Sequence, residues 1–185
     1  MTPLYVVLGA VLVLLLWVAA MYNSLVRLRN ACDESWSDID AELRRRYDLI
    51  PNLVETVKGY AAHEREVFER VVQARNAAVA SQGSPASQAR DENVLIDSMK
   101  RLFAVAESYP TLKADQHYLE LMRELSNTED RIARARRFYN GNVRDLGNRI
   151  EVFPSNLVAS AFGFQKREFF EIEDSTARAT PEVQL

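Results

Sequence analysis

The sequence predicts an all-α protein in which a single N-terminal transmembrane helix continues into an antiparallel bundle of four long helices. A charge-free apolar run extends from Leu4 to Met21, and apolar residues then recur at steps of three or four from Leu25 to Ile50. The 185 residues include only six Gly and six Pro, which favours long helices over a β fold rich in turns. Between residues 10 and 50 neither Gly nor Pro occurs, so the apolar run and the following stripe are expected to form one helix.

Residues 1–22 are predicted to be a transmembrane anchor. At about 1.5 Å per residue the run from Leu4 to Met21 spans about 27 Å, close to the roughly 30 Å hydrocarbon core of a bilayer. Tyr5, Trp17 and Tyr22 lie near its two ends, where aromatic rings prefer the lipid–water interface. The run exceeds the usual apolar core of a signal peptide and no basic residue precedes it, so we expect a retained anchor.

The charges beside this anchor predict its orientation. Arg27 and Arg29 follow the apolar run closely, whereas no Lys or Arg precedes it. The positive-inside rule therefore predicts a single-pass protein of the plasma membrane with the N-terminus outside and the remaining domain in the cytoplasm. The lipid bilayer is the first expected partner, through the N-terminal helix.

The first bundle helix carries its apolar stripe at Leu25, Leu28, Cys32, Trp36, Ile39, Leu43, Tyr47 and Ile50. We expect this helix to stop near Asp48, because Pro51 lacks a backbone donor and disfavours helical geometry at the preceding residue. Asp48 would then cap a second helix from about Leu49 to Ala80, with Pro51 in its first turn.

A loop and a third helix are expected next. Small polar residues with Gly83 and Pro85 predict a loop from Ser81 to Arg90. The third helix is predicted from about Glu92 to Glu107, and Pro110 follows its end.

The fourth helix is predicted to begin between Thr111 and Asp115 and to continue to Ile150. A capping box of Ser126 and Glu129 would allow a break within it. The near-heptad apolar spacing is unbroken there, and it favours a continuous helix.

The last part of the chain divides into two segments beyond the predicted bundle of residues 23–155. Residues 156–172 form an aromatic-rich segment, and residues 173–185 are predicted to be a disordered tail. Five of the eight Phe of the chain lie at or near this segment, at Phe153, Phe162, Phe164, Phe169 and Phe170. We expect these rings to pack against the bundle or the first helix. The alternative is an anchor at the lipid interface or a contact between protomers.

Composition excludes some classes of function. The net charge of −3 lacks the basic excess of a nucleic-acid-binding surface, so nucleic acid is not an expected partner. Cys32 is the only cysteine, which excludes an intrachain disulfide, and its place in the apolar stripe predicts a small buried hydrophobe.

The histidines offer little for metal chemistry. His63 and Glu64 begin like a zinc-protease motif, but that motif needs a second His four residues after the first, where this chain has Val67. The other histidine, His117, is predicted to lie on a different helix. We predict a structural or surface role for both histidines.

The remaining polar candidates are also predicted to be structural. Glu64, Glu129 and Arg136 fall on the helix seams, where a charge must be paired, so we expect ion pairs that fix helix register. Arg44-Arg45-Arg46 is predicted to be a solvated face that also complements the end of the first helix. No catalytic, cofactor-binding or metal-ligating residue, and no cofactor, is therefore predicted.

Several stretches resemble those of a known family. They are YNSLVRLRNACDESWSDIDAELRRRYDLIPNLVETVKGYAAHE (Tyr22–Glu64), ENVL (Glu92–Leu95), RLFAVAESYPTLKA (Arg101–Ala114), TEDRIARARRFYN (Thr128–Asn140) and FPSN followed by FGF (Phe153–Phe164). In this order they resemble the LemA family over about Tyr22 to Glu171. The resemblance implies a bacterial protein with one N-terminal membrane helix and an antiparallel bundle of long helices, and it implies no catalytic role or cofactor. The chain departs from the family pattern at Asp145–Asn148, and a bend of the fourth helix near Gly141 or Gly147 stays open.

These observations predict a non-enzymatic, membrane-anchored helical bundle of the coiled-coil type. We expect a scaffold or assembly protein that forms a homo-oligomer and binds a partner protein that the sequence does not identify. One alternative is a regulator of envelope signalling, although only about three residues would lie outside the membrane. The other is a metal-dependent hydrolase that uses the region of His63 and Glu64.

Overall fold

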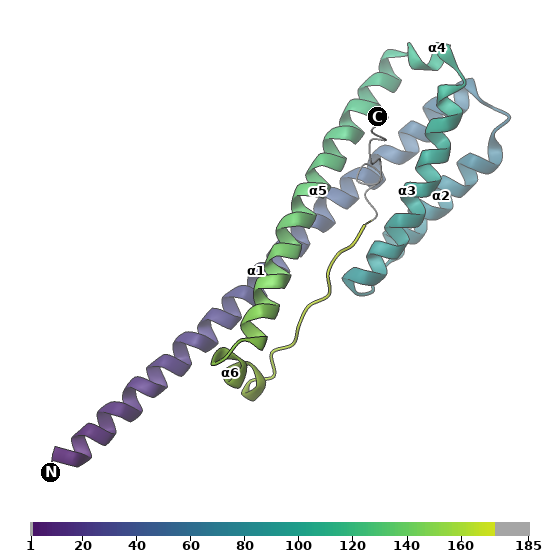
Figure 1. Cartoon of the computed structure of the whole chain (residues 1–185). Coiled ribbons are helices and arrows are strands. Elements are labelled where there is room, and N and C mark those ends of the chain that lie inside the picture. The colour runs from purple at the N-terminus through teal and green to yellow at the C-terminus, as the bar shows by residue number, and fades with distance from the viewer. Residues whose placement is uncertain (1, 173–185) are drawn as a thin grey trace, which may run out of the picture. The chain divides into compact units, whose positions relative to one another are not determined.

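The computed structural model describes residues 2–172, and the predicted tail of residues 173–185 lies outside this range. Within residues 2–172 all regular secondary structure is helical and no β-strand occurs, which confirms the predicted fold class (Figure 1). The helices are α1 (Thr2–Tyr60), α2 (Arg65–Ala80), α3 (Pro85–Glu107), α4 (Pro110–Lys113), α5 (Gln116–Glu151) and α6 (Ser155–Ala161). They form two compact units. Unit 1 comprises α1 up to Asp40 and residues Ala133–Glu168, and unit 2 comprises Ala41–Ile132 and residues 169–172.

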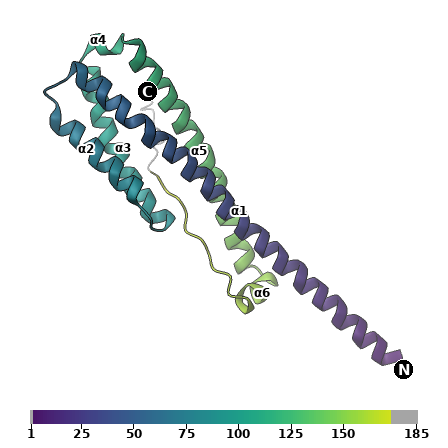
Figure 2. The same cartoon turned by 180° about the vertical axis from the view of Figure 1, so that it is seen from behind.

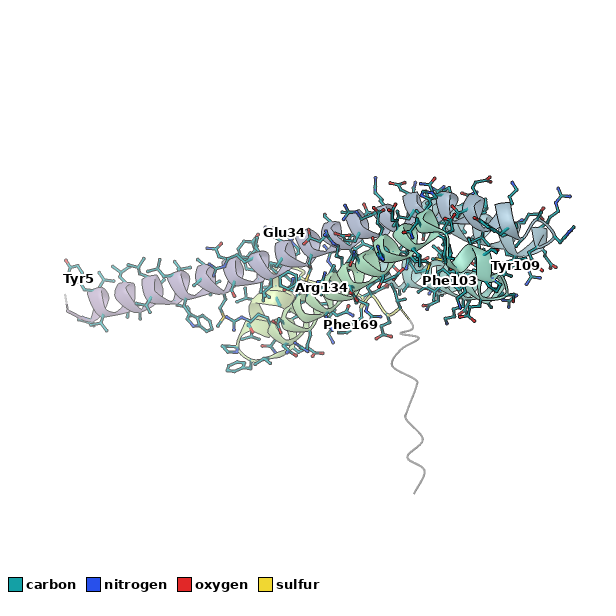
Figure 3. The ribbon with its side chains drawn as sticks, turned by 90° about the horizontal axis from the view of Figure 1, so that it is seen from above. Tyr5, Glu34, Phe103, Tyr109, Arg134 and Phe169 are labelled. Atoms are coloured by element: carbon teal, nitrogen blue, oxygen red, sulfur yellow. The ribbon has the colours of Figure 1, made fainter. Side chains whose placement is uncertain are left out.

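The N-terminal part of α1 stands clear of α5 and α6 in unit 1 (Figures 1 and 2). All large apolar side chains between Leu4 and Leu16 are 48% to 70% exposed, and Tyr5 projects freely near this end of the helix (Figure 3). An isolated helix that is apolar on every side has no favourable place in water. By length and composition, this part of α1 qualifies as a segment that could cross a membrane.

The core of unit 1 begins at Leu25, which is fully buried. Its buried side chains are Leu25, Cys32 and Ile39 of α1, Tyr139, Val143 and Leu146 of α5, and Val158 and Ala159 of α6. The members from α1 recur every seven residues and those from α5 at steps of four and three, so each helix buries one face. The apolar stripe predicted for the first bundle helix is confirmed in this unit.

Unit 2 packs the second half of α1 with α2, α3, α4 and the first half of α5. A short turn joins α2 to α3, and the two helices lie side by side in antiparallel directions in both views (Figures 1 and 2). The core contains Ile50, Leu53 and Val57 of α1, Phe68, Val71 and Ala78 of α2, Leu95, Met99 and Leu102 of α3, Leu112 of α4, and Tyr118, Leu121 and Leu125 of α5.

The predicted end of the first helix near Asp48 is wrong, because α1 continues through Pro51 to Tyr60. Pro51 cannot donate to the carbonyl four residues earlier, which belongs to Tyr47. Arg75 of α2 supplies the missing donor, with its Nε atom 3.1 Å from the Tyr47 carbonyl oxygen. A side chain distant in sequence therefore replaces the lost bond, and the chain reverses only in the turn between Tyr60 and Arg65.

The third helix also begins earlier than predicted, at Pro85 instead of Glu92. Ser84 is its N-cap, with its side-chain oxygen accepting from the Ser87 backbone N–H at 3.4 Å, and Pro85 occupies the first turn. A serine followed by proline starts a helix as readily as it forms a loop, since proline's missing donor is not needed in the first turn. The predicted end at Glu107 is confirmed.

The fourth predicted helix corresponds to α5 and is continuous from Gln116 to Glu151, so the capping-box alternative is not used. Asp115 caps it, with Oδ1 accepting from the Tyr118 backbone N–H at 2.9 Å. The helix also runs through Gly141 and Gly147 without interruption.

Candidate functional site

Tyr22, the first residue after the apolar run, contacts two rings from the segment that follows α6. Its ring centroid lies 4.8 Å from that of Phe162 and 5.7 Å from that of Phe164. The guanidinium of Arg29 lies 5.6 Å from the centre of the Phe164 ring, within cation–π range. We call Tyr22, Arg29, Phe162 and Phe164 the aromatic collar. The collar holds the C-terminal segment beside α1 at the point where the apolar run ends.

The turn that positions these rings depends on Gly163. This residue has φ +69°, a left-handed backbone conformation that residues with a Cβ rarely adopt. The Phe164 N–H donates to the Ala159 carbonyl at 2.9 Å and the Gly163 N–H to the Ser160 carbonyl at 3.3 Å. These two bonds form a Schellman motif that ends α6. The predicted packing against the first helix is confirmed for Phe162 and Phe164, whereas Phe153 remains 73% exposed.

Beyond the collar, the chain is fastened to both long helices of unit 1. Arg167 pairs with Asp33 of α1 at 2.7 Å, and Lys166 pairs with Glu151 at the end of α5. The Tyr139 hydroxyl donates to the Glu168 carbonyl oxygen at 2.9 Å. Burial, followed by the nearby Cys32, raises the pKa of Tyr139 to about 12.

A buried cluster of polar side chains links the helices of unit 2. Arg46 is fully buried and pairs with the fully buried Glu92 through Nη2, while its Nη1 atom lies 3.0 Å from Oε1 of Glu129. The Tyr47 hydroxyl donates to Glu92. The Gln88 side-chain amide lies 3.0 Å from both the Tyr47 hydroxyl and Oε1 of Glu92. We call Arg46, Tyr47, Gln88, Glu92 and Glu129 the ion network.

The ion network connects all four long helical segments of unit 2 through two neighbouring residues of α1. Arg46 and Tyr47 bond to Gln88 and Glu92 of α3, and Arg46 also bonds to Glu129 of α5. The Tyr47 carbonyl accepts from Arg75 of α2. A slip of α1 against any of these helices would leave a buried charge without a partner, so the network fixes helix register.

The electrostatics of the ion network keep Arg46 charged and Tyr47 neutral. Burial alone would lower the pKa of Arg46, but the charges of Glu92 and Glu129 outweigh this and raise it. Burial and then the charge of Glu92 raise the pKa of Tyr47 well above its ordinary value. Tyr47 is therefore a donor to Glu92 and not an acid that can release its proton near neutral pH.

The prediction of a solvated Arg44-Arg45-Arg46 face is wrong for Arg46. Arg44 and Arg45 are exposed, whereas Arg46 is fully buried. The missed signal is a strict seven-residue series on α1, in which Arg46 continues the buried positions Leu25, Cys32, Ile39 and Leu53. Glu129, in contrast, is ion-paired as predicted.

The other polar candidates lie on different elements. His63 and Glu64 lie in the turn between α1 and α2, so Glu64 is half-buried beside a helix start and is not on a helix seam. His117 is exposed in the first turn of α5, and Arg136 is half-buried farther along that helix. Among residues 2–172, no group of three or more His, Cys, Asp or Glu is arranged to hold a metal ion.

Cys32 is a buried core residue of unit 1, as predicted. Its side chain is 1% exposed, and burial raises the pKa of the thiol. A thiol that is both covered and protonated is a poor nucleophile.

Sequence comparison with known proteins identifies the family of this chain. A model of the LemA family matches residues 35–185. Magnetosome protein MamQ 2 of Paramagnetospirillum magneticum is 28% identical over 175 residues, which cover 81% of this chain and 64% of that protein. The chain therefore spans less than two thirds of the length of this relative. Magnetosome protein MamQ of Magnetospirillum gryphiswaldense is 26% identical over 88% of this chain and 70% of its own, and Protein LemA of Metamycoplasma hominis is 26% identical over 82% and 69%. Since the family model matches most of its length, the chain belongs to the LemA family.

Proposed function

We propose that this protein is a non-enzymatic, membrane-anchored helical scaffold of the bacterial plasma membrane. One observation carries the proposal: a single uninterrupted helix, α1, joins an apolar segment exposed on every side to packed cores that begin at Leu25. Water disfavours the exposed segment, whereas a bilayer would accommodate it with all its backbone groups paired within the helix.

The buried polar groups support a structural and not a catalytic role. In the ion network, Glu92 and Tyr47 are covered and bonded to neighbouring side chains, and Arg46 is held by two carboxylates. Groups engaged in this way are not available to a substrate, and their arrangement suits a rigid scaffold.

Membrane anchoring can be tested by extraction of the full chain from bacterial membranes with alkaline carbonate. We expect the protein to stay in the membrane pellet, because its helix spans the bilayer. The variant Leu12→Arg/Leu14→Arg should move largely to the soluble fraction, since each Arg near the bilayer centre costs about 2.5–3.5 kcal/mol. Leu12→Ala/Leu14→Ala is the matched control and should stay in the pellet. Release of the unchanged protein by carbonate would contradict the proposal.

We further propose that the scaffold is a homo-oligomer. Val72 and Val79 support this, because they lie seven residues apart on α2 and are 42% and 49% exposed. Light scattering of the detergent-solubilised protein should give a protein mass that is a multiple of 21.1 kDa. The variant Val72→Glu/Val79→Glu should reduce this mass, whereas Gln73→Glu/Ala80→Glu, with the same added charge, should reduce it less. A strict monomer at micromolar concentration would contradict the oligomer.

A further inference from the structure

The end of unit 1 next to the apolar run exposes a group of large apolar side chains. They are Val152 (59% exposed), Phe153 (73%), Leu157 (61%) and Phe162 (57%). No Asp, Glu, Lys or Arg occurs between Glu151 and Lys166, and these two flanking charges pair with each other. We call these four side chains the apolar cap. A group of this kind on a folded unit usually marks a surface that contacts something apolar.

The side chains of the apolar cap are held in exposed positions by α6 and by the backbone hydrogen bonds at its two ends. In α6 the face of Ser155, Val158 and Ala159 is buried, so Leu157 necessarily points away from the unit. The Asn156 N–H donates to the Val152 carbonyl at 3.0 Å and the Leu157 N–H to the Pro154 carbonyl at 3.2 Å, which ties Val152 and Phe153 to the start of α6. The Schellman motif after α6 fixes Phe162.

The aromatic collar sets the position of the apolar cap along α1. Phe162 belongs to both groups, and its ring contacts that of Tyr22 at 4.8 Å. Both ribbon views show α6 beside the part of α1 where the free N-terminal stretch ends (Figures 1 and 2). The cap therefore lies at the level of α1 at which a membrane-spanning segment would leave the hydrocarbon core.

We propose that the apolar cap inserts into the lipid–water interface of the same membrane, as a second contact beside the spanning helix. This inference rests on the proposed membrane anchor. Aromatic and aliphatic side chains that enter the boundary of headgroups and acyl chains reach about 5–10 Å into it. The lipid surface is the favoured occupant because the cap is continuous with the apolar run through Tyr22. Basic side chains also lie next to it in the structure, since Arg29 contacts the Phe164 ring and Lys166 pairs with Glu151, the residue before Val152.

The inference can be tested by spin-label accessibility in the full chain, reconstituted in vesicles of phosphatidylcholine and phosphatidylglycerol. In a Cys32→Ala background, single cysteines replace Phe153, Leu157 or Phe162 and carry a nitroxide label. Collision rates are measured with oxygen, which concentrates in lipid, and with a water-soluble nickel chelate. Phe138 is the matched control, because it is an exposed phenylalanine of the same unit (62% exposed) about 20 Å along α5 from Glu151. Leu12 reports on the spanning segment itself.

We expect the ratio of oxygen to nickel accessibility to be several-fold higher at Phe153, Leu157 and Phe162 than at Phe138, and highest at Leu12. A lipid-like Leu12 together with water-like labels in the apolar cap would overturn this inference and leave the membrane anchor standing. Cap labels shielded from both reagents would show that protein, such as a second copy of the chain, covers the cap, and this would also overturn it. A water-like Leu12 would overturn the proposed anchor and, with it, the interface that the cap is said to enter.

Discussion

At the scale of single residues, Arg46 and Tyr47 connect α1 to the other long helices of unit 2 through hydrogen bonds and ion pairs. Two adjacent residues on a helix point about 100° apart, so together they can reach helices on two sides. Arg46 has its Nε atom without a hydrogen-bond partner among residues 2–172, so its burial is compensated by its two carboxylate partners alone. A buried pair of this kind adds little net stability, but removal of one partner is costly.

Replacement of the buried partner of Arg46 should therefore be severe. Glu92→Gln leaves a buried guanidinium with only the half-exposed Glu129, and we expect a loss of about 3 kcal/mol in the free energy of unfolding. Glu129→Gln should cost about 1 kcal/mol, because the side chain of Glu129 is 42% exposed and its pairing is screened by solvent. Denaturation of the detergent-solubilised protein, followed by far-ultraviolet circular dichroism, measures both. Arg45→Gln, at an exposed neighbouring position, should change stability by less than about 0.5 kcal/mol. Equal effects of the three changes would contradict a buried ion network.

The raised pKa of Tyr139 predicts that the folded protein loses stability at alkaline pH. Its pKa is raised to about 12 in the folded protein, mainly by burial, whereas an unfolded tyrosine titrates near pH 10. Between these values the unfolded chain loses a proton that the folded chain keeps, so stability falls as pH rises, by about 1.4 kcal/mol per pH unit for this group. Tyr139→Phe cannot ionise, so its stability deficit relative to the unchanged protein should shrink above pH 10. A deficit that stays constant from pH 9 to pH 11.5 would contradict this prediction.

At the scale of elements, α1 shows how packing overrides a helix-breaking residue. Pro51 removes one hydrogen bond, but the helix on either side buries Tyr47, Ile50, Leu53 and Val54 in the core of unit 2. Burial of each such side chain contributes about 1.5–3 kcal/mol, which together outweighs a local cost of about 3 kcal/mol for an interior proline. Arg75 reduces that cost further by bonding to the Tyr47 carbonyl.

The effects of replacing Pro51 and Arg75 on the free energy of unfolding should not be additive. Arg75→Met leaves the Tyr47 carbonyl without its donor, and we expect a loss of about 1–3 kcal/mol. Pro51→Ala restores a backbone N–H that can bond to this carbonyl, so Arg75→Met should cost about 1 kcal/mol less in that background. A double-mutant cycle of unfolding free energies measures the difference. Strict additivity of the two changes would show that Arg75 does not compensate for the proline.

Glycines in different elements should respond to alanine with opposite signs. Gly163→Ala places a residue with a Cβ at a backbone position that is left-handed at the end of α6, which should cost about 1–2 kcal/mol. Gly141→Ala lies within α5, where an added Cβ meets no atom within 4 Å, and it should stabilise the protein by about 0.5–1 kcal/mol. Thermal unfolding of the two variants gives the comparison. Stabilisation by Gly163→Ala would exclude the Schellman motif.

At the scale of the whole molecule, the proposed orientation depends on charges near the end of the apolar run. Arg27→Gln/Arg29→Gln combined with Pro3→Lys reverses the charge bias, so we expect a fraction of molecules to insert with the bundle outside. Reporters at the C-terminus measure this, with a fluorescent protein active in the cytoplasm and alkaline phosphatase active outside. Arg44→Gln/Arg45→Gln also removes two positive charges, about 25 Å farther along α1, and should leave orientation unchanged. Phosphatase activity of the unchanged chain would contradict the predicted orientation.

The sequence by itself determined the fold class, the apolar run, the C-terminal ends of three of the four predicted helices and the paired state of Glu129. These features follow from helical periodicity and from the length of a segment without charges, which are local properties of the sequence. Only the tertiary structure decided that α1 passes Pro51, that Arg46 is buried, and that Tyr22 meets Phe162. Each of these depends on a partner distant in the chain, namely Arg75, Glu92 or the turn at Gly163. The conformational or solvation preference of a single residue, such as that of Pro51 to end a helix or of Arg46 to face water, is worth about 1–3 kcal/mol and can be read from the sequence. The contacts that outweigh this preference come from residues distant in the chain, and packing between helices determines them.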